Sequence, residues 1–438
     1  MMRRKITHIT GLLTVLILVW PVVADPGKPV AVRWWGQAFV TIETYWNLTI
    51  AIDPYATSIG YDDPKITADV VLVTHNHRDH SNVSLLGKGA TAVIGLDNKS
   101  NVASIDMVLD RLPNQDKPTL TAFSPSAEYS IHAVRFRSIT SFHDDQSGSR
   151  RGNNAMFLIQ ADGVRILHCG DLGQTKLTED QLGLIGQVDV LLIPVGGVYT
   201  VDGKQAAAIV AQISPRYVVP IHYKTPQLTI PLNTDEEFLK ALSSKYERKT
   251  PVGNTLAVAH NLAGSDESLQ VVTLHTRPWK MPNELAELFK RKDAANRKSQ
   301  EVFAKLSTKQ MNHRPSNGTH TPRWNAEHMM GRELGFFSKI YNSVDPAIPS
   351  INLNPKQMPA DYVAAHPDWD GKEEARQMQR VISFTRRFAY LFDGITLETK
   401  PPGSWWTVRG LLEQMQRHYG EHTSNVKDKF ELPDWPGE

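Results

Sequence analysis

The chain has 438 residues, more than one ordinary hydrophobic core uses, so at least two folded units are expected. Its hydrophobic content of 41% and charged content of 21% are typical of globular proteins and exclude a largely disordered chain. The formal net charge of +2 gives no support to nucleic-acid binding by bulk electrostatics. The single cysteine, Cys169, excludes an intramolecular disulfide framework and a cysteine-rich zinc site.

The first 24 residues have the pattern of a secretory signal peptide. A basic start at residues 3–5 precedes an apolar run at 11–20, and small residues ending at Ala24 offer a cleavage site. The apolar run is shorter than the roughly 20 residues that span a bilayer, so a cleaved signal is expected rather than a membrane anchor. We therefore expect export to the periplasm or the cell exterior, with no stable membrane span after cleavage.

Residues 25–275 are expected to form the first domain. Short apolar runs separated by Gly, Asp, Asn and Pro are typical of strands and turns. The strands expected are residues 30–33, 39–42, 48–52, 70–73, 156–159, 164–167, 188–193, 217–221 and 269–274. A helix is expected over residues 204–213, after Asp202 and Gly203. This combination predicts an α/β domain of packed sheets covered by helices.

Residues 276–438 show a different pattern, in which apolar residues recur among polar ones with the spacing of a helix. The helices expected are residues 284–306, 322–342, 372–392 and 407–427. Amphipathic helices of this length pack most naturally as an all-α four-helix bundle. The sequence therefore predicts a two-domain chain with a boundary near residue 275.

The most informative segment, THNHRDH at residues 74–80, follows the expected strand 70–73 directly. It offers His75, His77, Asp79 and His80 as metal-binding side chains at the end of a strand. The alternative is a hydrophilic loop that is rich in histidine by chance, but the spacing favours a metal site. Imidazole and carboxylate ligands together suit zinc, iron or manganese.

This segment resembles the HxHxDH motif of the metallo-β-lactamase superfamily, and the resemblance extends over about residues 30–260. Further motif residues stand at the ends of other apolar runs, namely Asp53, His143, Asp171 and His222. The resemblance implies an αββα sandwich that binds one or two divalent metals. It assigns His75, His77 and His143 to one metal, and Asp79, His80 and His222 to a second. It also implies that Asp171 bridges the two metals and that Asp53 supports the metal-binding loop.

Three other segments are similar to the branch of ascorbate-6-phosphate lactonases and N-acylphosphatidylethanolamine phospholipase D: residues 33–38, 152–157 and 194–200. That branch usually has histidine where Gln37 stands. The resemblance implies a hydrolase whose metal-bound hydroxide attacks a lactone, ester or phosphodiester in a small-molecule or lipid-like substrate. Asp79 or Asp171 would orient the hydroxide or accept its proton. The alternative is a metal-binding sensor or scaffold with an inactive sandwich, although all seven ligand positions are filled.

The remaining histidines of the first domain, His132, His168 and His260, fit no ligand position and are interpreted as structural. Cys169, beside Asp171, is interpreted as a small buried residue rather than a ligand or nucleophile.

The last expected helix carries His418 and His422, four residues apart on one face, a spacing that can hold one metal. Two histidines that simply pack near a helix end are the alternative. Together with His328, the pair resembles the metal site of DinB-like four-helix bundles, and His320 is a rival for the third ligand. The resemblance implies a further divalent metal and either a thiol-transferase activity or a structural or binding role.

Overall fold

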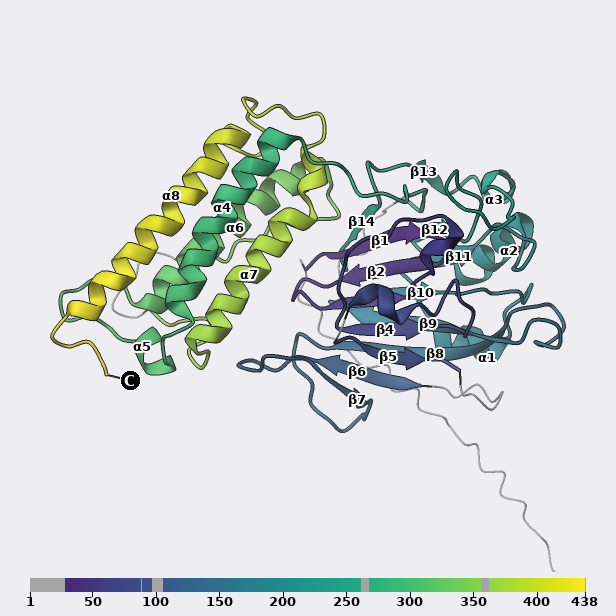
Figure 1. Ribbon diagram of the computed structural model, residues 1–438, viewed down its shortest axis with the longest axis horizontal. Helices are drawn as coiled ribbons and strands as arrows, with labels where there is room; N and C mark the ends of the chain where they lie inside the picture. Colours follow the sequence, from purple (N-terminus) through teal and green to yellow (C-terminus); the bar gives the residue numbers. More distant parts are fainter. Residues whose placement is uncertain (1–27, 88, 97–104, 261–267, 356–361, 438) are drawn as a thin grey trace, which may run out of the picture.

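The computed structural model describes residues 28–87, 89–96, 105–260, 268–355 and 362–437. These residues form a two-sheet sandwich and, beside it, a region of long helices (Figure 1). The last strand ends at Val272 and the first long helix begins at Asn283. The expected signal peptide lies outside the described residues. Within the described part of the chain, no helix is both long enough and apolar enough to cross a membrane.

The first sheet has six strands in the order β14-β1-β2-β3-β4-β5. They are β1 (Val30–Gly36), β2 (Phe39–Glu43), β3 (Thr49–Ile52), β4 (Val70–Val73), β5 (Thr91–Ile94) and β14 (Thr255–Val258). β3, β4 and β5 run parallel to one another. Their carboxyl ends therefore meet at one edge of the sheet, so the residues that follow β3 and β4 become neighbours.

The second sheet has nine strands in the order β13-β15-β12-β11-β10-β9-β8-β6-β7. Their bounds are β6 (Asp106–Asp110), β7 (Thr119–Ala122), β8 (Val134–Phe142), β9 (Asn153–Ala161), β10 (Val164–His168), β11 (Val190–Pro194), β12 (Tyr217–Ile221), β13 (Glu247–Lys249) and β15 (Gln270–Val272). β10, β11 and β12 are parallel, whereas β9 is antiparallel to both β8 and β10. The carboxyl ends of β8, β10 and β12 therefore share one edge.

The two sheets enclose a common apolar core, to which Ile52 and Leu72 contribute from the first sheet and Phe136 and Ile166 from the second. The helices α1 (Glu179–Ile185), α2 (Gly203–Ile213) and α3 (Glu236–Ala241) lie beside the nine-stranded sheet. Over the six-stranded sheet, the described residues supply loops and the short 3₁₀ turns η1 (Thr57–Ile59) and η2 (Val83–Leu86). The described part of this layer thus differs from the helical layer expected on that side.

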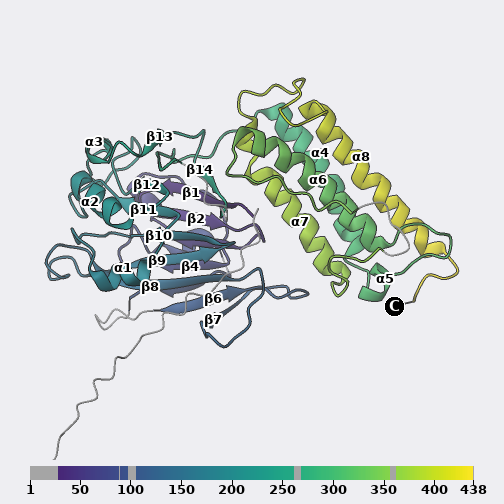
Figure 2. The ribbon, with the colours of Figure 1, turned by 180° about the vertical axis from the view of Figure 1, so that it is seen from behind.

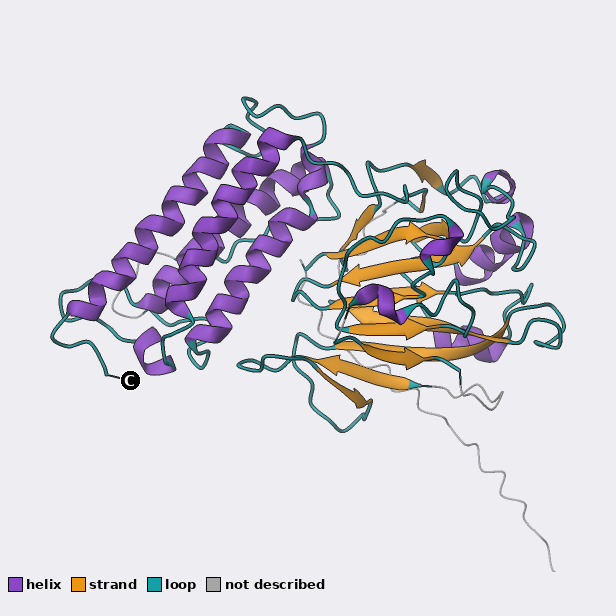
Figure 3. Ribbon diagram, in the orientation of Figure 1, coloured by secondary structure: helices purple, strands orange, loops and turns teal. Residues whose placement is uncertain are grey.

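The described residues of the helical region, 283–355 and 362–431, contain four long helices: α4 (Asn283–Phe303), α6 (Pro322–Val344), α7 (Gly371–Arg387) and α8 (Val408–Lys427). Shorter elements are α5 (Thr308–Met311), η3 (Ala389–Phe392) and η4 (Asp428–Glu431). α4 and α6 each pack against both α7 and α8 (Figures 2 and 3). The side chains of Thr321, Asp370 and Thr407 cap the N-termini of α6, α7 and α8, which explains where these helices begin.

The strands expected from sequence and the helix over residues 204–213 are confirmed, with shifts of a few residues at their ends. The four long helices are also confirmed, but α7 ends at Arg387 and continues as η3. The sequence predicted no residue range for the strands β5, β6, β7, β8, β13 and β14 or for the short helices α1 and α3, although it placed a strand end before His143. Several of these strands are partly exposed, so their residues do not form a continuous apolar run.

Candidate metal centre

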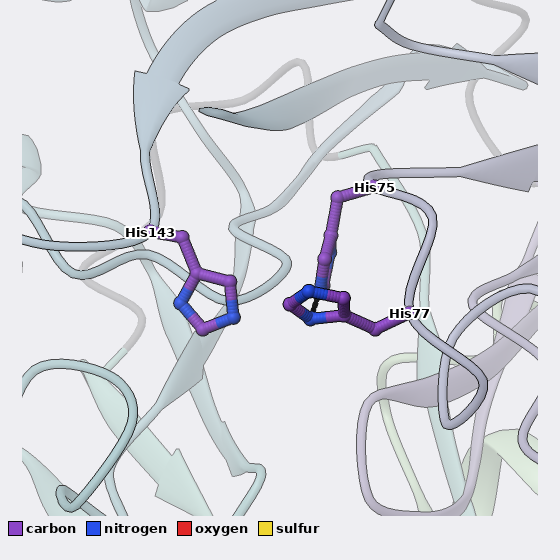
Figure 4. A group of neighbouring side chains, drawn as sticks. All are labelled: His75, His77 and His143. Carbon is purple, nitrogen blue, oxygen red and sulfur yellow. Dashed lines mark hydrogen bonds between the residues drawn. The ribbon is translucent and has the colours of Figure 1, made fainter. Parts of the chain in front are cut away.

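The strand ends of both sheets bring the expected ligands to one place. His75 follows β4 of the six-stranded sheet, and the other sheet contributes His143 after β8, Asp171 after β10 and His222 after β12. Figure 4 shows the imidazoles of His75 and His77, from the loop after β4, facing the imidazole of His143, which follows β8. The site therefore lies at the rim of the sandwich, where both sheets end.

A first group consists of three imidazoles. Nε2 of His75 lies 3.0 Å from Nδ1 of His77, and one nitrogen of each of His75, His77 and His143 lies within 4.8 Å of the others. His75 and His143 are buried, whereas His77 is exposed. These are the three residues that the sequence predicted for one metal.

A second group consists of Asp79, His80 and His222, whose ligand atoms also lie within 4.8 Å of one another. Nε2 of His80 is 3.5 Å from Oδ2 of Asp79. His80 and His222 are buried and Asp79 is half-buried. The sequence predicted these three residues for a second metal.

Asp171 lies between the two groups and turns one oxygen toward each. Its Oδ2 is 3.2 Å from Nε2 of His143 and 3.8 Å from Nε2 of His75. Its Oδ1 is 3.2 Å from Nε2 of both His80 and His222. This arrangement is the one that a bridging carboxylate requires.

Asp53 supports the metal-binding loop, as the sequence predicted. Its carboxylate accepts hydrogen bonds from the backbone N–H of Thr74 (2.8 Å) and the hydroxyl of Thr74 (2.7 Å), and lies 3.0 Å from Nδ1 of His80. The Thr74 hydroxyl is also 3.0 Å from Nδ1 of His75. Because these contacts use the Nδ1 atoms, the Nε2 atoms of His75 and His80 are left to face Asp171.

The turn that carries Asp171 is held by polar contacts of its own. The side-chain oxygen of Asn154 accepts the backbone N–H of Asp171 (2.9 Å), and its amide donates to the carbonyl of Cys169 (2.8 Å). His168 has Nε2 2.9 Å from the carbonyl of Ala38 and accepts the N–H of Gly170, in agreement with a structural role. Cys169 is fully buried, and burial raises the pKa of its thiol, which agrees with its interpretation as a small buried residue.

The ionisable side chains of the site shift one another's pKa values. Burial alone would raise the pKa of Asp171, but the imidazoles of His222 and His80 hold it well below its usual range. Burial alone would lower the pKa of His80, yet Asp171 and Asp53 raise it well above the ordinary value. For His75, burial and the neighbouring His80 lower the pKa well below the ordinary value. A metal bound to His80 would thus replace the proton that the two carboxylates favour.

The donor set fits divalent metals. Nε2 of His80 and Oδ1 of Asp171 are buried and make no hydrogen bond among the described residues, although each is a strong polar group. Leaving such atoms without a partner is costly, and a cation between them would satisfy both. Imidazole nitrogens with carboxylate oxygens suit zinc, iron or manganese.

Gln37 stands beside this centre. Its amide nitrogen donates to Oδ2 of Asp79 (3.0 Å), and its backbone carbonyl accepts the N–H of His222 (2.9 Å) and Nε1 of Trp34 (2.9 Å). Gln37 and His222 both have positive φ values, 50° and 51°, which are uncommon away from glycine. The glutamine thus links the second ligand group to β1 without offering a metal-binding imidazole.

The centre opens into a pocket of about 500 Å³. Ligand residues line it together with four residues to which the sequence analysis gave no role: Arg150, Arg151, Tyr199 and Ile230. A signal for the arginines was present, because two adjacent basic residues stand in a Gly- and Ser-rich segment shortly after His143. Thr74 and Asn154 had no such signal, since a hydroxyl or amide that supports a ligand follows no fixed spacing.

A separate cluster lies in the helical region, where ligand atoms of His328, His418 and His422 are within 4.8 Å of one another. Oδ1 of Asn325 lies 2.7 Å from Nδ1 of His422. Burial, with nearby positive charge and imidazoles, lowers the pKa of His328 and His422 to about 4 and that of His418 to about 3. His320, the rival ligand, is outside this group and stacks on Trp324 at 3.7 Å between ring centroids.

Comparison with known proteins places the similarity in the sandwich. Residues 31–222 match the family model of the beta-lactamase superfamily domain. A UPF0173 metal-dependent hydrolase of Anaeromyxobacter sp. (strain K) is 31% identical over 230 residues, 49% of this chain and 82% of that protein. Its counterpart in Thermococcus onnurineus (strain NA1) is 30% identical over 223 residues, 50% of this chain and 94% of that protein. A metallo-β-lactamase superfamily structure from Thermotoga maritima shares 29% identity, covers 56% of this chain and 98% of its own, and has a TM-score of 0.38.

Proposed function

This chain belongs, through its N-terminal half, to the UPF0173 metal-dependent hydrolases of the metallo-β-lactamase superfamily, and on that basis we propose that its sandwich hydrolyses a lactone, ester or phosphodiester. The observation that carries the proposal is the position of Asp171, whose two oxygens face two different sets of imidazoles. His75, His77 and His143 would hold one metal, and Asp79, His80 and His222 the other. A structural zinc site is usually closed, whereas this centre opens into a pocket.

Divalent cations bound here would supply Lewis acidity and lower the pKa of a coordinated water toward neutrality. The chain itself supplies orientation and proton handling. Asp53 and Thr74 fix the loop from which His75 and His80 project. Asp79, half-buried and held by the Gln37 amide, lines the pocket together with Asp171, and either carboxylate would orient the attacking water or accept its proton.

The test measures metal content and hydrolysis together on the full chain. We expect Asp171→Asn to lower the metal content of the sandwich and to reduce hydrolysis of a lactone, ester and phosphodiester panel by more than about 100-fold, because the shared ligand loses its charge. His132→Gln, a change at a buried histidine outside both ligand groups, is the matched control and should leave both quantities unchanged. Full metal content and activity in Asp171→Asn would contradict the proposal. A metal-loaded wild type that hydrolyses nothing would instead favour a sensor or scaffold.

We also propose that the helical region holds a further divalent metal through His328, His418 and His422, as a DinB-like bundle would. Three buried or half-buried imidazoles with lowered pKa values and no carboxylate ligand among them are neutral donors ready for a cation. Nδ1 of His422 contacts Asn325, which leaves Nε2 of His422 for the metal.

Elemental analysis separates this second site from the first. His418→Ala should remove one equivalent of metal and leave hydrolysis by the sandwich intact, since the histidine lies in another region of the chain. His320→Ala, next to the cluster but outside it, should keep that equivalent. Equal metal content in wild type and His418→Ala would mean that the three histidines serve only in packing.

We also propose export of the protein on the basis of the first 24 residues, and the N-terminal sequence of the mature protein would test it.

A further inference from the structure

Another pocket, of about 430 Å³, lies apart from the metal centre. Residues on the outer side of the six-stranded sheet form one wall of it, and the segment that joins β15 to α4 forms another. Four aromatic rings line it, those of Trp35, Tyr55, Tyr61 and Trp279. Among the described residues, none lines both this pocket and the pocket of the metal centre. A molecule bound here would therefore not take the place of the substrate.

The polar atoms of the rings on the sheet side are engaged by the protein itself. Nε1 of Trp35 donates to the hydroxyl of Thr41 (3.0 Å). The hydroxyl of Tyr55 donates to the backbone carbonyl of Asp62 (2.9 Å). A ligand would therefore meet mainly the carbon atoms of these two rings.

Tyr61 is held in place at its hydroxyl and along its ring. Its hydroxyl lies 2.7 Å from the hydroxyl of Thr225, and its ring centre is 5.1 Å from that of Tyr55. The ring also packs directly on the backbone of Gly36, which has a φ of 110°. A Cβ atom at Gly36 would lie 2.5 Å from Cζ of Tyr61, so a larger residue there would displace the ring. The aromatic wall is thus preformed, which lowers the cost of ordering it when a ligand binds.

Trp279 supplies the facing ring from the segment that joins the sandwich to the helical region. It is half-buried, and its Nε1 donates to a carboxylate oxygen of Asp393, which follows η3 (2.8 Å). Because this bond holds the polar edge of the indole against the helical region, the carbon surface of the ring is left for the pocket.

The charged residues of this pocket are few and lie at its rim. Nη2 of Arg277 is 3.2 Å from Oδ2 of Asp62, and both side chains are largely exposed. Lys280, also exposed, adds one positive charge. The remaining lining residues are uncharged, namely Gln227, Thr276 and two prolines. Because exposed charges are screened by solvent and salt, apolar and aromatic contact is the main source of affinity that the pocket offers.

We propose that this pocket is an accessory binding site for a small uncharged aromatic molecule. Its volume of about 430 Å³ is in the range of small-molecule sites. Aromatic walls favour a ligand ring that stacks on them or meets them edge to face. Since the polar atoms of the walls are already bonded, a ligand that needs few hydrogen bonds loses least when it leaves water.

Equilibrium binding of 1-naphthol to the metal-loaded full chain is the first measurement. We expect saturable binding of one molecule per chain. Decahydro-1-naphthol, which has the same carbon skeleton and hydroxyl without aromatic rings, should bind at least about 3-fold more weakly, because it cannot form aromatic pairs with the walls.

Two pairs of variants locate the bound molecule. Trp279→Phe and Trp279→Leu both lose the hydrogen bond to Asp393, and only the first keeps an aromatic ring. We expect 1-naphthol to bind Trp279→Leu at least about 3-fold more weakly than Trp279→Phe. Gln227→Trp fills the pocket with a side chain and should weaken binding at least about 10-fold. Ala294→Trp adds the same side chain at an exposed position of α4 and should change the affinity by less than about two-fold.

Metal content should be the same in all four variants, because none of the changed residues lines the metal pocket. Absence of saturable 1-naphthol binding to wild type would overturn the proposal. Undiminished affinity in Gln227→Trp would also overturn it, since the molecule would then bind elsewhere. Equal affinities for 1-naphthol and decahydro-1-naphthol, or for 1-naphthol in Trp279→Phe and Trp279→Leu, would contradict aromatic recognition. These titrations do not depend on hydrolysis, so they decide this proposal whether or not the sandwich proves to be a hydrolase.

Discussion

At the scale of single residues, the histidines divide into those that face a metal centre and those that are buried for packing. His132 belongs to the second kind: it is 5% exposed and packs against Trp46 in a tilted arrangement with ring centroids 4.0 Å apart. Nδ1 of His132 lies 3.1 Å from the carbonyl of Arg111. Burial and, to a smaller extent, the nearby Arg380 lower the pKa of His132 from its ordinary value of 6.5 to about 4.

This shift predicts a pH-dependent stability. Between pH 6.5 and pH 4 the unfolded chain binds a proton at His132 that the folded chain does not bind, so the free energy of unfolding decreases as the pH falls through this window. By pH 5 the loss from this residue is roughly 2 kcal/mol. His132→Gln stays neutral and should lose less stability between pH 7 and pH 5 than wild type, as measured by urea unfolding.

His275→Gln is the matched control, because it removes an exposed imidazole. Its stability should fall between pH 7 and pH 5 as much as that of wild type. An identical pH dependence for His132→Gln and wild type would contradict a neutral buried His132.

Residue patterns in the sequence located the ligands better than their supports. His75 to His80 stand close together in the chain, and Asp53, Asp171 and His222 each follow an apolar run, so chain position alone marks them, whereas His143 was assigned by the family resemblance. Thr74 and Asn154 act through hydrogen bonds between segments far apart in sequence. Such contacts depend on strand register and loop shape, which no local pattern of residues encodes.

At the scale of elements, the site depends on how closely two strand ends approach each other. Gly173, in the turn after β10, donates its backbone N–H to the carbonyl of Phe142 at the end of β8 (2.8 Å). A Cβ atom at this glycine would lie 2.4 Å from the carbonyl carbon of His143 and 2.5 Å from the backbone nitrogen of Asp144. Only glycine permits this approach, which sets the distance between His143 and Asp171.

Gly173→Ala should therefore push the end of β8 away from the turn after β10. We expect a loss of about 1–3 kcal/mol in the free energy of unfolding, and metal affinity at least about 10-fold weaker, as displaced ligands predict. Gly183→Ala is the control, because a Cβ atom there meets nothing within 4 Å and Gly183 lies in α1. It should be neutral or stabilising by up to about 1 kcal/mol. Calorimetry and metal titration would check both, and similar results for the two variants would contradict the argument.

The burial pattern of β8 explains why a search for apolar runs does not find every strand of this fold. β8 carries His143 at its end, and its residues alternate between buried and half-exposed along most of its length. Arg135 and Arg137 occupy half-exposed positions of that alternation, so the strand contains no continuous apolar run. A search for apolar runs finds strands that are buried on both faces, such as β11 and β12, and misses strands with one polar face.

At the scale of the whole molecule, the helical region is joined to the sandwich by a buried polar contact. Arg387, at the end of α7, has a side chain that is 2% exposed. It lies 3.0 Å from a carboxylate oxygen of Glu43 at the end of β2 and donates to the carbonyl of Thr44 (2.6 Å). Beside it, the guanidinium carbon of Arg380 lies 4.4 Å from the centre of the Tyr45 ring. Burial alone would raise the pKa of Glu43, but Arg33 and Arg387 hold it below its ordinary value.

Removing Arg387 should therefore weaken the connection between the two parts. Truncation removes the partner of the Glu43 carboxylate and one of the donors to the Thr44 carbonyl. Arg387→Ala is therefore expected to lower the free energy of unfolding by about 3 kcal/mol, a typical cost of breaking a buried ion pair. For a folded part of roughly 150–250 residues that unfolds as a unit, this corresponds to a decrease of roughly 6–12 °C in its melting temperature. Arg409→Ala, which removes an exposed pairing with Glu284 and Glu398, is the control and should change the melting temperature little.

Calorimetry and limited proteolysis of residues 273–282, which join β15 to α4, would test this expectation. In Arg387→Ala the two parts should unfold separately, so one of them should melt at a lower temperature than the other. Proteolysis of the joining segment should also be faster than in wild type. Metal content of the sandwich should not change, because Arg387 contacts β2 and the adjacent turn rather than the strand ends that carry the ligands. Unchanged melting and cleavage in Arg387→Ala would mean that the remaining contacts hold the two parts together without it, among them the apolar packing of Tyr45 and Trp46 and the hydrogen bonds of Asn114 with Glu373 and Asp370.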